Sequence, residues 1–354
     1  MNLKPLPATI GPGEVAQSDI SSTRRWRHWL PIVAVLAAAC CWGAQGVTYS
    51  LILNGIQTDG LTVVTLRAVT ATLLLWIWLA MTDPAALRIP QGDLPAFTLL
   101  GFIAITIFYP SLFYAYQWTS ISVATTLLYL SPALVTLGAA LFLGEPLTRR
   151  KLIALVTTFL GSALVVQVYQ SADLAGSAAG IGLGLIAAAS YGTYSVLGKR
   201  LLGQYRMATV LAAYLMLGTL LLIGVKLLVS PTTWPSPREA ITIGLSTGVL
   251  ATLLPITLYT YGLSRLPASE ASILLTLEPV VAFVLAAAVL GESLSAGQRL
   301  GATAVLGGVV LITWPGRTSF RTSIAALGRS RNHPRCWWPG TNAGCARPLE
   351  RNQT

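Results

Sequence analysis

The chain has 354 residues, of which 54% are hydrophobic and 10% are charged, and its mean hydropathy is +0.68. Soluble domains carry about a quarter charged residues, so this composition excludes an ordinary soluble protein. A formal net charge of +11 would suit nucleic-acid binding, but the charges lie in short loops and tails between long apolar runs. This segregation favours a membrane protein instead.

Most apolar runs reach the ~20 residues that cross ~30 Å of hydrocarbon as a helix. Membrane strands would alternate over ~10 residues, and a lipid-exposed backbone must satisfy its own hydrogen bonds, so we predict helices. In chain order, the sequence predicts ten spans: 30–53, 62–81, 95–116, 121–143, 152–169, 179–198, 208–229, 241–263, 268–290 and 299–315. The predicted fold class is an all-α integral membrane protein.

The segments outside the spans divide the chain. Residues 1–28 are polar with Pro, Gly and Ser, and residues 316–354 are Arg-rich without a helical period, so we expect both tails to be disordered. The linker 170–178 separates a first half at 29–169 from a second half at 179–315, each with five spans.

The first apolar run follows a basic segment and so imitates a secretory signal. It continues past Cys41 to about Leu53, which is too long for a signal peptide, so we expect no cleavage. Cys40 and Cys41 are expected to be small core residues. His28 and His333 stand alone in the sequence, and we expect neither a metal site nor a cofactor.

The chain repeats itself at one fixed offset. Residues 114–132 read YAYQWTSISVATTLLYLSP, and residues 261–279 read YGLSRLPASEASILLTLEP. Each block continues through an apolar stretch to a Leu-Gly-Glu tripeptide, which ends at Glu145 in the first half and at Glu292, 147 residues later, in the second. Such repeats in a hydrophobic chain indicate a membrane transporter built from two halves, with a substrate site where they meet.

The number of spans and the charges predict how the halves are oriented. Five spans per half is an odd number, so the second half enters the membrane from the opposite side, and we expect inverted repeats. If both termini lie on one side, that side holds nineteen of the 23 basic residues and the other side holds three. The positive-inside rule then places both termini in the cytoplasm, in a bacterial-type inner membrane.

Paired motifs in the two halves carry a family resemblance over about residues 30–315. They are Trp42-Gly43 and Tyr191-Gly192, Arg67 after Thr65-Leu66, the stretches from Pro132 to Glu145 and from Pro279 to Glu292, and the small pairs Leu160-Gly161 and Gly307-Gly308. The chain resembles the EamA-type permeases of the drug/metabolite transporter superfamily. The resemblance implies ten helices in inverted repeats and the transport, often export, of varied small metabolites. In two departures, Ser131 stands where the second half has Glu278, and the Arg-rich tail lies outside the pattern.

Glu278 is the main candidate for substrate binding and for coupling. It lies near the middle of the ninth span, directly before Pro279, which frees a nearby carbonyl that can line a polar cavity. A charge at that depth costs a few kcal/mol and therefore needs a function or a partner. The carboxyl can bind a substrate amine or carry a proton, and the alternative is a structural carboxyl bonded to a neighbouring helix.

Other charges in or near the spans are open to two interpretations. Arg67 can hold a substrate carboxylate, or it can be structural, by snorkelling or by pairing with Glu278, and the structural role is favoured. Glu270 is expected to cap its helix. Glu145 and Glu292 recur symmetrically at helix ends, so we expect each to brace the helix that follows.

The remaining cavity candidates share an aromatic or amide side chain inside a span. Tyrosine and tryptophan combine an apolar face with a donor, which suits amphiphilic ligands and cation–π contacts. The resemblance implies that their helices, together with the ninth, surround a central cavity, whereas tryptophans at the span ends fit an interfacial belt. These candidates are Trp42, Gln45, Tyr109, Tyr114, Tyr129, Tyr191, Tyr194, Tyr259 and Tyr261.

Four prolines lie inside spans, two in each half: Pro110, Pro132, Pro255 and Pro279. Paired breaks in matching helices are candidates for hinges of alternating access. The alternative is a set of kinks with no part in gating.

The sequence therefore predicts a transporter, and we expect an exporter of amino acids or related amphiphilic metabolites that works by alternating access around a midplane cavity. Coupling to protons is open, as is the oligomeric state. The alternative within the superfamily is a sugar or nucleotide-linked sugar transporter, although a phosphate would favour clustered Lys or Arg, and apart from Lys226 and Arg299 near span ends the spans contain only Arg67. An integral-membrane enzyme would need a catalytic cluster, and a sensor would need a domain in the tails, and neither pattern is present in the sequence.

Overall fold

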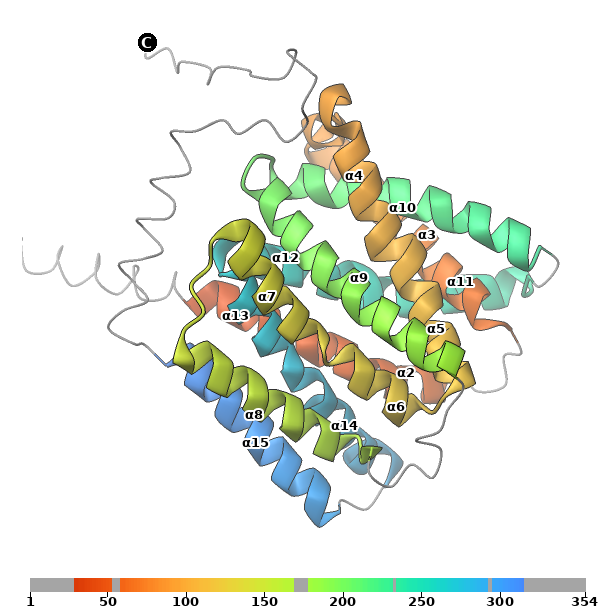
Figure 1. Ribbon diagram of the computed structural model, residues 1–354. Coiled ribbons are helices and arrows are strands. Elements are labelled where there is room, and N and C mark those ends of the chain that lie inside the picture. The colour runs from red at the N-terminus through yellow and green to blue at the C-terminus, as the bar shows by residue number, and fades with distance from the viewer. Residues whose placement is uncertain (1–28, 53–57, 169–177, 232–233, 292–294, 315–354) are drawn as a thin grey trace, which may run out of the picture.

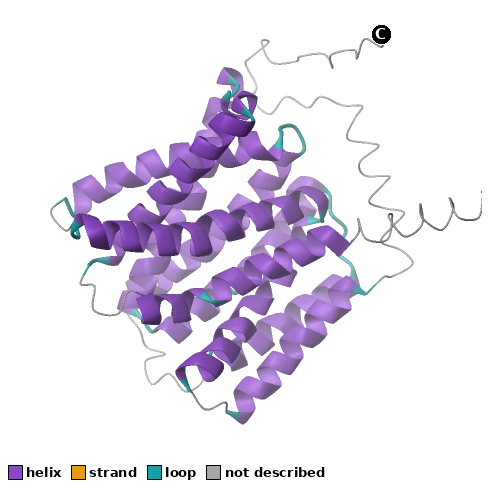
Figure 2. Cartoon of the chain, turned by 180° about the vertical axis from the view of Figure 1, so that it is seen from behind, coloured by secondary structure: helices purple, strands orange, loops and turns teal. Residues whose placement is uncertain are grey.

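The computed structural model describes residues 29–52, 58–168, 178–231, 234–291 and 295–314. Within these ranges every regular element is helical, as predicted (Figure 2). Eight helices are long and apolar enough to cross a membrane, and the shorter apolar helix Trp29–Gly43 precedes them. The described chain is thus a helical multi-pass bundle, and the count of ten spans stays a prediction.

The elements follow one another as the apolar runs predicted (Figure 1). The first half holds the helix Trp29–Gly43, α2 (Gln45–Ile52), α3 (Gly60–Thr82), the 3-10 turns η1 (Pro84–Leu87) and η2 (Gln91–Asp93), α4 (Leu94–Gly101), the π-helix η3 (Phe102–Ile107), α5 (Phe108–Trp118), α6 (Ile121–Leu128), α7 (Ser131–Leu143) and α8 (Arg149–Val165). The second half holds α9 (Ala178–Leu202), α10 (Met207–Val229), α11 (Pro237–Gly248), the π-helix η5 (Val249–Leu253), α12 (Leu254–Arg265), α13 (Ala268–Leu274), the 3-10 turn η6 (Leu275–Leu277), α14 (Glu278–Leu290) and α15 (Ala296–Thr313).

The sequence repeat is also a repeat of secondary structure. Helices α3 and α10 begin 147 residues apart and end 147 residues apart, and so do α7 and α14. The two π-helices, η3 and η5, begin at the same offset. Matching sequence thus produces matching helices and matching irregularities.

Proline explains where two long spans become π-helical. Pro110 and Pro255 have no N–H, so the carbonyls four residues earlier, of Thr106 and Ala251, lack their α-helical donor. The backbone widens into a π-helix just before each proline, in η3 and in η5.

A second pair of prolines marks interruptions in the fourth and ninth spans. Pro132 lies in the first turn of α7, after the break at Tyr129-Leu130, and Pro279 lies in the first turn of α14, after η6. Each predicted continuous helix is therefore two helices, which together still have the length of one span.

The recurring Leu-Gly-Glu tripeptide terminates a helix. Gly144 ends α7 with φ 68°, and Gly291 ends α14 with φ 72°. Glycine adopts this left-handed backbone without the penalty that a Cβ atom brings. In each half the next helix then starts at a hydroxyl N-cap, Thr148 or Ser295, so the repeat encodes a helix stop and the following start.

Helices from the two halves interleave in two groups. In group A, α4 to α7 pack with α9 and α10 of the second half. In group B, α2 packs against α11 and α14, and the helix Trp29–Gly43 contacts α12 and α14 through Val35 and Gly43. Helix α3 lies between the groups, because it packs against α11 and η5 of group B and against α10 of group A. Group B also includes α13, which joins α12 to α14 in the chain. Each group therefore mixes both halves of the sequence.

Helices α8 and α15 form a separate pair that lies side by side at the edge of the bundle (Figure 1). A Cβ atom built on Gly161 would lie 2.8 Å from the Gly301 carbonyl oxygen, and one built on Gly301 would lie 2.6 Å from the Gly161 carbonyl oxygen. Only glycine permits so close an approach of two backbones, which is the small-residue packing of membrane helices.

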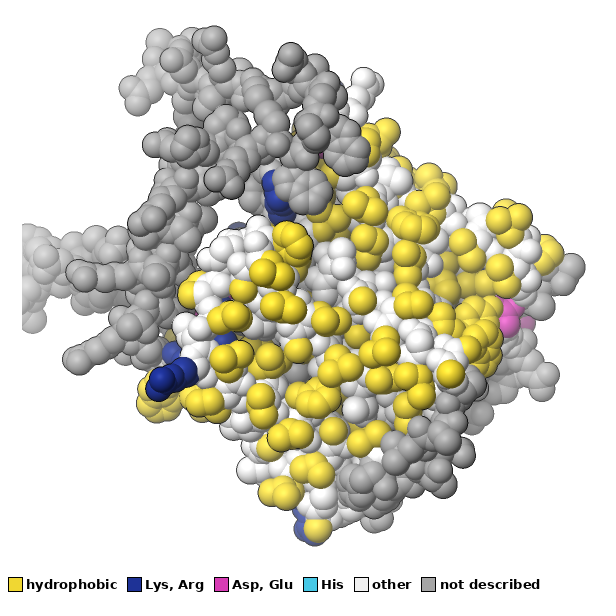
Figure 3. All heavy atoms as spheres, in the orientation of Figure 1, with side chains coloured by type: hydrophobic (Ala, Val, Ile, Leu, Met, Phe, Trp, Pro, Cys, Tyr) yellow, Lys and Arg dark blue, Asp and Glu magenta, His cyan; other side chains and the backbone are white. Residues whose placement is uncertain are grey.

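The surface supports insertion in a bilayer. In Figure 3 hydrophobic side chains are spread over the visible face, while Lys and Arg side chains appear at its edges. Large apolar residues such as Leu228, Phe142 and Leu141 are 86%, 66% and 68% exposed. Cys40 is also exposed, so its expected place in the core is wrong, because its side of the helix faces outward, whereas Cys41 is half-buried.

Candidate substrate pocket

A narrow pocket lies between group A and group B. The space between its walls that atoms do not fill is about 360 Å³, including part of the open surroundings, and the room inside it for the centre of a water-sized molecule is about 30 Å³. Its lining comes from the helix Trp29–Gly43, η3, α5, α9, α10 and α12. The lining residues are Trp42, Ala104, Ile105, Phe108, Tyr109, Tyr191, Tyr194, Tyr214 and Ile256. Six of the nine are aromatic, so a ligand here would meet mainly ring faces and edges.

The aromatic rings form one connected cluster. The Tyr191 ring centroid lies 6.0 Å from that of Phe108, 6.1 Å from that of Tyr194 and 6.1 Å from that of Tyr259. Trp42 joins the cluster through Tyr259, at 6.1 Å between centroids. These separations are those of favourable aromatic pairs, so the rings support one another's positions.

The tyrosine hydroxyl groups of the cluster differ in their hydrogen bonds. The Tyr259 hydroxyl bonds to Ser195 Oγ at 3.0 Å, and the Tyr194 and Tyr214 hydroxyls are 3.5 Å apart. The buried Tyr191 hydroxyl has no hydrogen-bond partner within the described ranges. A buried hydroxyl without a partner is costly, and a bound ligand can supply the missing bond.

Hydrogen bonds to the Ala251 carbonyl, which Pro255 leaves without its α-helical donor, hold one wall of the pocket. It accepts hydrogen bonds from Trp42 Nε1 at 3.1 Å and from the Arg67 guanidinium at 2.6 Å. Arg67 also donates to Thr252 Oγ1 at 2.7 Å and lies 4.7 Å from the centroid of the Tyr109 ring. The arrangement favours the structural role of Arg67, because its donors bind the π-helix of η5.

Glu278, the first residue of α14, is not one of the lining residues but lies next to this wall. A Cβ atom on Gly43 would lie 2.7 Å from the Glu278 carbonyl oxygen, so the helix Trp29–Gly43 crosses α14 there. The carboxylate is half-buried and within electrostatic range of Tyr129 and Tyr191. The ion pairs and hydrogen bonds found among the described residues do not include its carboxylate oxygens, which leaves it available to a ligand.

The other predicted residues have different surroundings. Tyr129 is buried at the break between α6 and α7, and Gln45 is half-buried at the start of α2. Tyr114 packs on Trp118 near the end of α5, with 5.6 Å between centroids, and Tyr261 lies under the Arg265 guanidinium at 3.8 Å. The structure therefore groups Trp42, Tyr109, Tyr191, Tyr194 and Tyr259, but not Gln45, Tyr114, Tyr129 or Tyr261, around the pocket.

Two lining aromatics were not predicted from the sequence. Phe108 stands next to Tyr109 at the start of α5, and Tyr214 lies in α10, a span that was not among those expected to surround the cavity. Tyr214 follows Arg67 by the repeat distance of 147 residues. Comparing the two halves position by position could have identified it.

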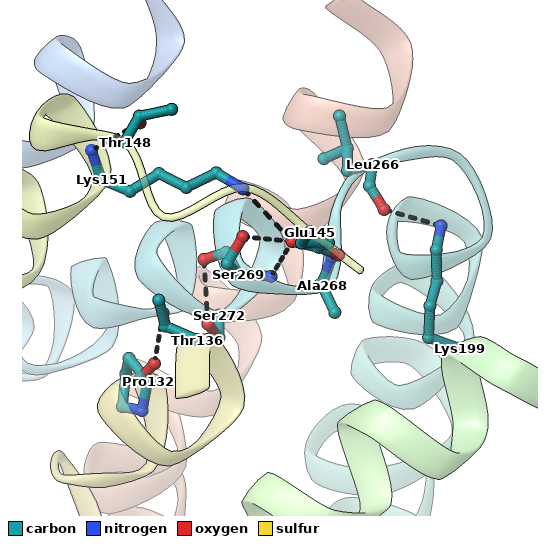
Figure 4. A network of polar contacts seen from close by, with 10 residues as sticks. All are labelled: Pro132, Thr136, Glu145, Thr148, Lys151, Lys199, Leu266, Ala268, Ser269 and Ser272. Carbon is teal, nitrogen blue, oxygen red and sulfur yellow. Dashed lines mark hydrogen bonds and ion pairs between the residues drawn. The ribbon is translucent and has the colours of Figure 1, made fainter. Parts of the chain in front are cut away.

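Glu145 has a larger set of partners than expected (Figure 4). It pairs with Lys151 of the following helix, at 3.2 Å between Nζ and Oε2, as the bracing role predicts. It also accepts hydrogen bonds from Ala268 and Ser269 at the start of α13. Glu292 lies outside the described residues, and its bracing role stays a prediction.

Comparison with known proteins identifies the family. The model of the EamA-like transporter family matches residues 29–167 and 178–314. The uncharacterised inner membrane transporter YicL of Salmonella typhimurium is 26% identical over 82% of this chain and 97% of its own. An uncharacterised transporter of Archaeoglobus fulgidus is 29% identical over 75% of this chain and 91% of its own.

Two further relatives extend the comparison. The threonine/homoserine exporter RhtA of Salmonella typhimurium is 27% identical over 80% of this chain and 92% of its own. A solved crystal structure with 16% sequence identity superposes with a TM-score of 0.69, over 81% of this chain and 98% of that one. At that identity the structural likeness concerns the fold alone.

Proposed function

Because this chain belongs to the EamA-like transporter family, we propose that it exports small amphiphilic metabolites that carry an amino group, amino acids among them. The substrate binds in the aromatic pocket between groups A and B. The pocket is exposed to each side of the membrane in turn, and the groups rock about it.

The observation that carries the proposal is the Glu278 carboxylate beside an aromatic pocket. An ammonium group interacts favourably with a carboxylate and with the faces of Trp and Tyr rings. The Arg67 guanidinium donates its hydrogen bonds to Ala251 and Thr252, so it does not compete with a substrate ammonium group for Glu278. The relative named threonine/homoserine exporter supports the same class of substrate.

The proposed architecture is ten spans in two inverted repeats, with both termini in the cytoplasm of an inner membrane. The matching bounds of α3 and α10 and the paired π-helices support the repeat. The concentration of basic residues on one side supports the orientation. The prolines beside the irregular segments serve as the hinges of the motion.

A sugar or nucleotide-linked sugar is the second candidate substrate class. A linked phosphate requires basic or backbone donors at the site. None of the residues found to line the pocket is basic. The pocket therefore favours the amine-bearing class.

The test is transport in proteoliposomes with a panel of amino acids and sugars, with and without an imposed pH gradient. Saturable transport of amino acids or amines, and not of sugars, is the expected result. A response to the gradient would favour proton coupling, whereas an equal rate without it would favour facilitation. Saturable transport of sugars alone would overturn the proposed substrate class.

A further inference from the structure

We propose that Glu145 and Lys199 form a two-armed latch that ties group A to group B and closes the pocket at the basic end of the molecule. The basic end is defined by Arg149, Arg150 and Lys151 at the start of α8 and by Lys199 and Arg200 near the end of α9. The inference rests on the proposed transport function, because a latch matters only where the pocket opens to each side in turn.

The acidic arm joins α7 of group A to α13 of group B. Glu145 Oε1 accepts from the Ala268 N–H at 2.6 Å, and Oε2 accepts from the Ser269 N–H at 3.3 Å and from the Ser269 hydroxyl. Lys151 holds the same carboxylate from α8 (Figure 4). The side chains of Glu145 and Lys151 are 12% and 6% exposed, so these charge-assisted bonds lie where water competes little.

The basic arm joins α9 of group A to α12 of group B. Lys199 Nζ donates to the carbonyl oxygens of Leu263 and Leu266, both at 2.7 Å. These carbonyls lie at the C-terminal end of α12, and Glu145 binds the N-terminal end of α13. Each charge therefore has the sign that its helix end favours, and the two arms hold both sides of the α12–α13 corner.

The equivalent corner in the first half is built differently. Helix α6 is capped locally, because Ser120 Oγ accepts from the Val123 N–H at 3.2 Å. The residue 147 positions later is Pro267, and it makes no side-chain cap for α13. The start of α13 therefore depends on Glu145 from the other group, whereas α6 supplies its own cap.

Packing around the two corners differs in the same way. Helix α13 packs against α7 and α8 as well as against α12 and α9. Its counterpart α6 packs against α5 and α9, which belong to its own group A. At the corner that the latch holds, groups A and B are joined directly, while the corresponding helix at the opposite end, α6, stays with its own group. The ion pair at that opposite end, between Asp59 and Lys226, joins α3 to α10 of group A and reaches no helix of group B. We infer that the structure represents the state closed at the basic end.

The test measures distances between spin labels at both ends, in a variant in which the four cysteines are replaced by serine. Labels at Gln204→Cys and Arg265→Cys report the basic end, and labels at Trp118→Cys and Leu51→Cys report the opposite end, since these four side chains are exposed. In each pair one label is on group A and the other on group B. The protein is held in lipid nanodiscs without substrate.

Glu145→Gln and Lys199→Gln are expected to lengthen the basic-end distance and to shorten the opposite one. The ratio of the closed to the open population should fall about tenfold, in line with the loss of a buried charge-assisted bond. Ser269→Ala, which removes only the hydroxyl donor, should shift the populations less, in the same direction. Ser120→Ala removes the local cap of α6 and is the matched control that should leave both distances unchanged.

Unchanged distances in both charge variants, with melting temperatures showing that they fold, would overturn the latch. If Glu145→Gln fails to fold, the distances between the same labels in Lys199→Gln and Ser269→Ala test the latch instead. The readout uses no substrate, so it is separate from the proposed function. If the variants shift the populations but the protein transports nothing from the panel, the proposed function is overturned and the latch is kept. If the protein transports a substrate but the variants leave the distances unchanged, the latch is overturned and the proposed function is kept.

Discussion

At the scale of single residues, the Ala251 carbonyl binds two residues of the paired motifs, Trp42 and Arg67. Pro255 deprives this carbonyl of its helical donor, and Trp42 and Arg67 replace that donor from two other helices. The arginine that the sequence offered as a possible substrate ligand thus lies in a structural bond. Glu278, whose carboxylate is not among the described hydrogen bonds and ion pairs, remains the charged side chain beside the pocket.

For Arg67, we expect Arg67→Lys to destabilise the protein by about 1–3 kcal/mol, since an ammonium cannot bond to Thr252 and Ala251 in the geometry of a guanidinium. Thermal unfolding in detergent measures the change. Arg238→Lys, at an exposed position in α11, is the control and should leave the melting temperature unchanged. A lysine variant as stable as the wild type would show that the bonds to η5 contribute little.

For Glu278, we expect Glu278→Gln to lower the transport of amine substrates at least tenfold while the protein stays folded, because the amide carries no charge to attract an ammonium group. If Glu278 also carries protons, the remaining transport should no longer depend on an imposed pH gradient. Proteoliposome assays at several pH values measure both effects. Normal transport by this variant across pH would contradict the coupling role, and Glu239→Gln, in the cap of α11, is the control.

At the scale of elements, apolar length predicted most helices well. The expected spans 62–81 and 208–229 became α3 and α10 within two residues at each end. The π-helices were not predicted, because proline alone does not distinguish a kink from a wider turn. The partners of Glu145 in α13 were also missed, since a contact over 123 residues depends on how the groups pack.

The packing of α8 against α15 allows a direct test with neighbouring glycines. Gly301→Ala should destabilise the protein by about 1–3 kcal/mol, because the new methyl group would collide with the Gly161 backbone. Gly307→Ala lies on the same helix, where a Cβ atom meets no atom within 4 Å, and it should be neutral or slightly stabilising. Thermal unfolding of both variants gives the comparison. Equal effects would indicate that α8 and α15 separate easily.

At the scale of the whole molecule, the two halves of the sequence are not the two groups of helices that pack together. Groups A and B each take helices from both halves, and the pocket lies between them. Expectations drawn from the repeat alone would assign the motion to the halves. The exchange of helices could not be predicted from the sequence, because it follows from which apolar faces meet.

If the two halves are inverted, as proposed, two positions that correspond in the repeat lie on opposite sides of the membrane. Arg149→Cys and Ala296→Cys are 147 residues apart, and both positions are exposed. In intact cells a membrane-impermeant thiol reagent should label the second cysteine and not the first, since the proposed orientation puts the first at the basic end, on the cytoplasmic side. Labelling after cell lysis is the control for accessibility. Equal labelling of both in intact cells would contradict inverted repeats.

Each π-helix holds one residue more than an α-helix of the same rise would need. Deleting one residue from η3 or from η5 would let the backbone return to α-helical bonding and leave the later side chains of that helix near their present directions. The same deletion within a regular α-helical turn would rotate every later side chain by about 100°. Tyr109 follows η3 and Tyr259 follows η5, so the loss of the extra residue in either half would keep the ring of that half in the pocket cluster. The π-helices are therefore the places in each half where the chain can lose one residue without moving the aromatic site, whereas a one-residue change elsewhere in these helices would rotate the site.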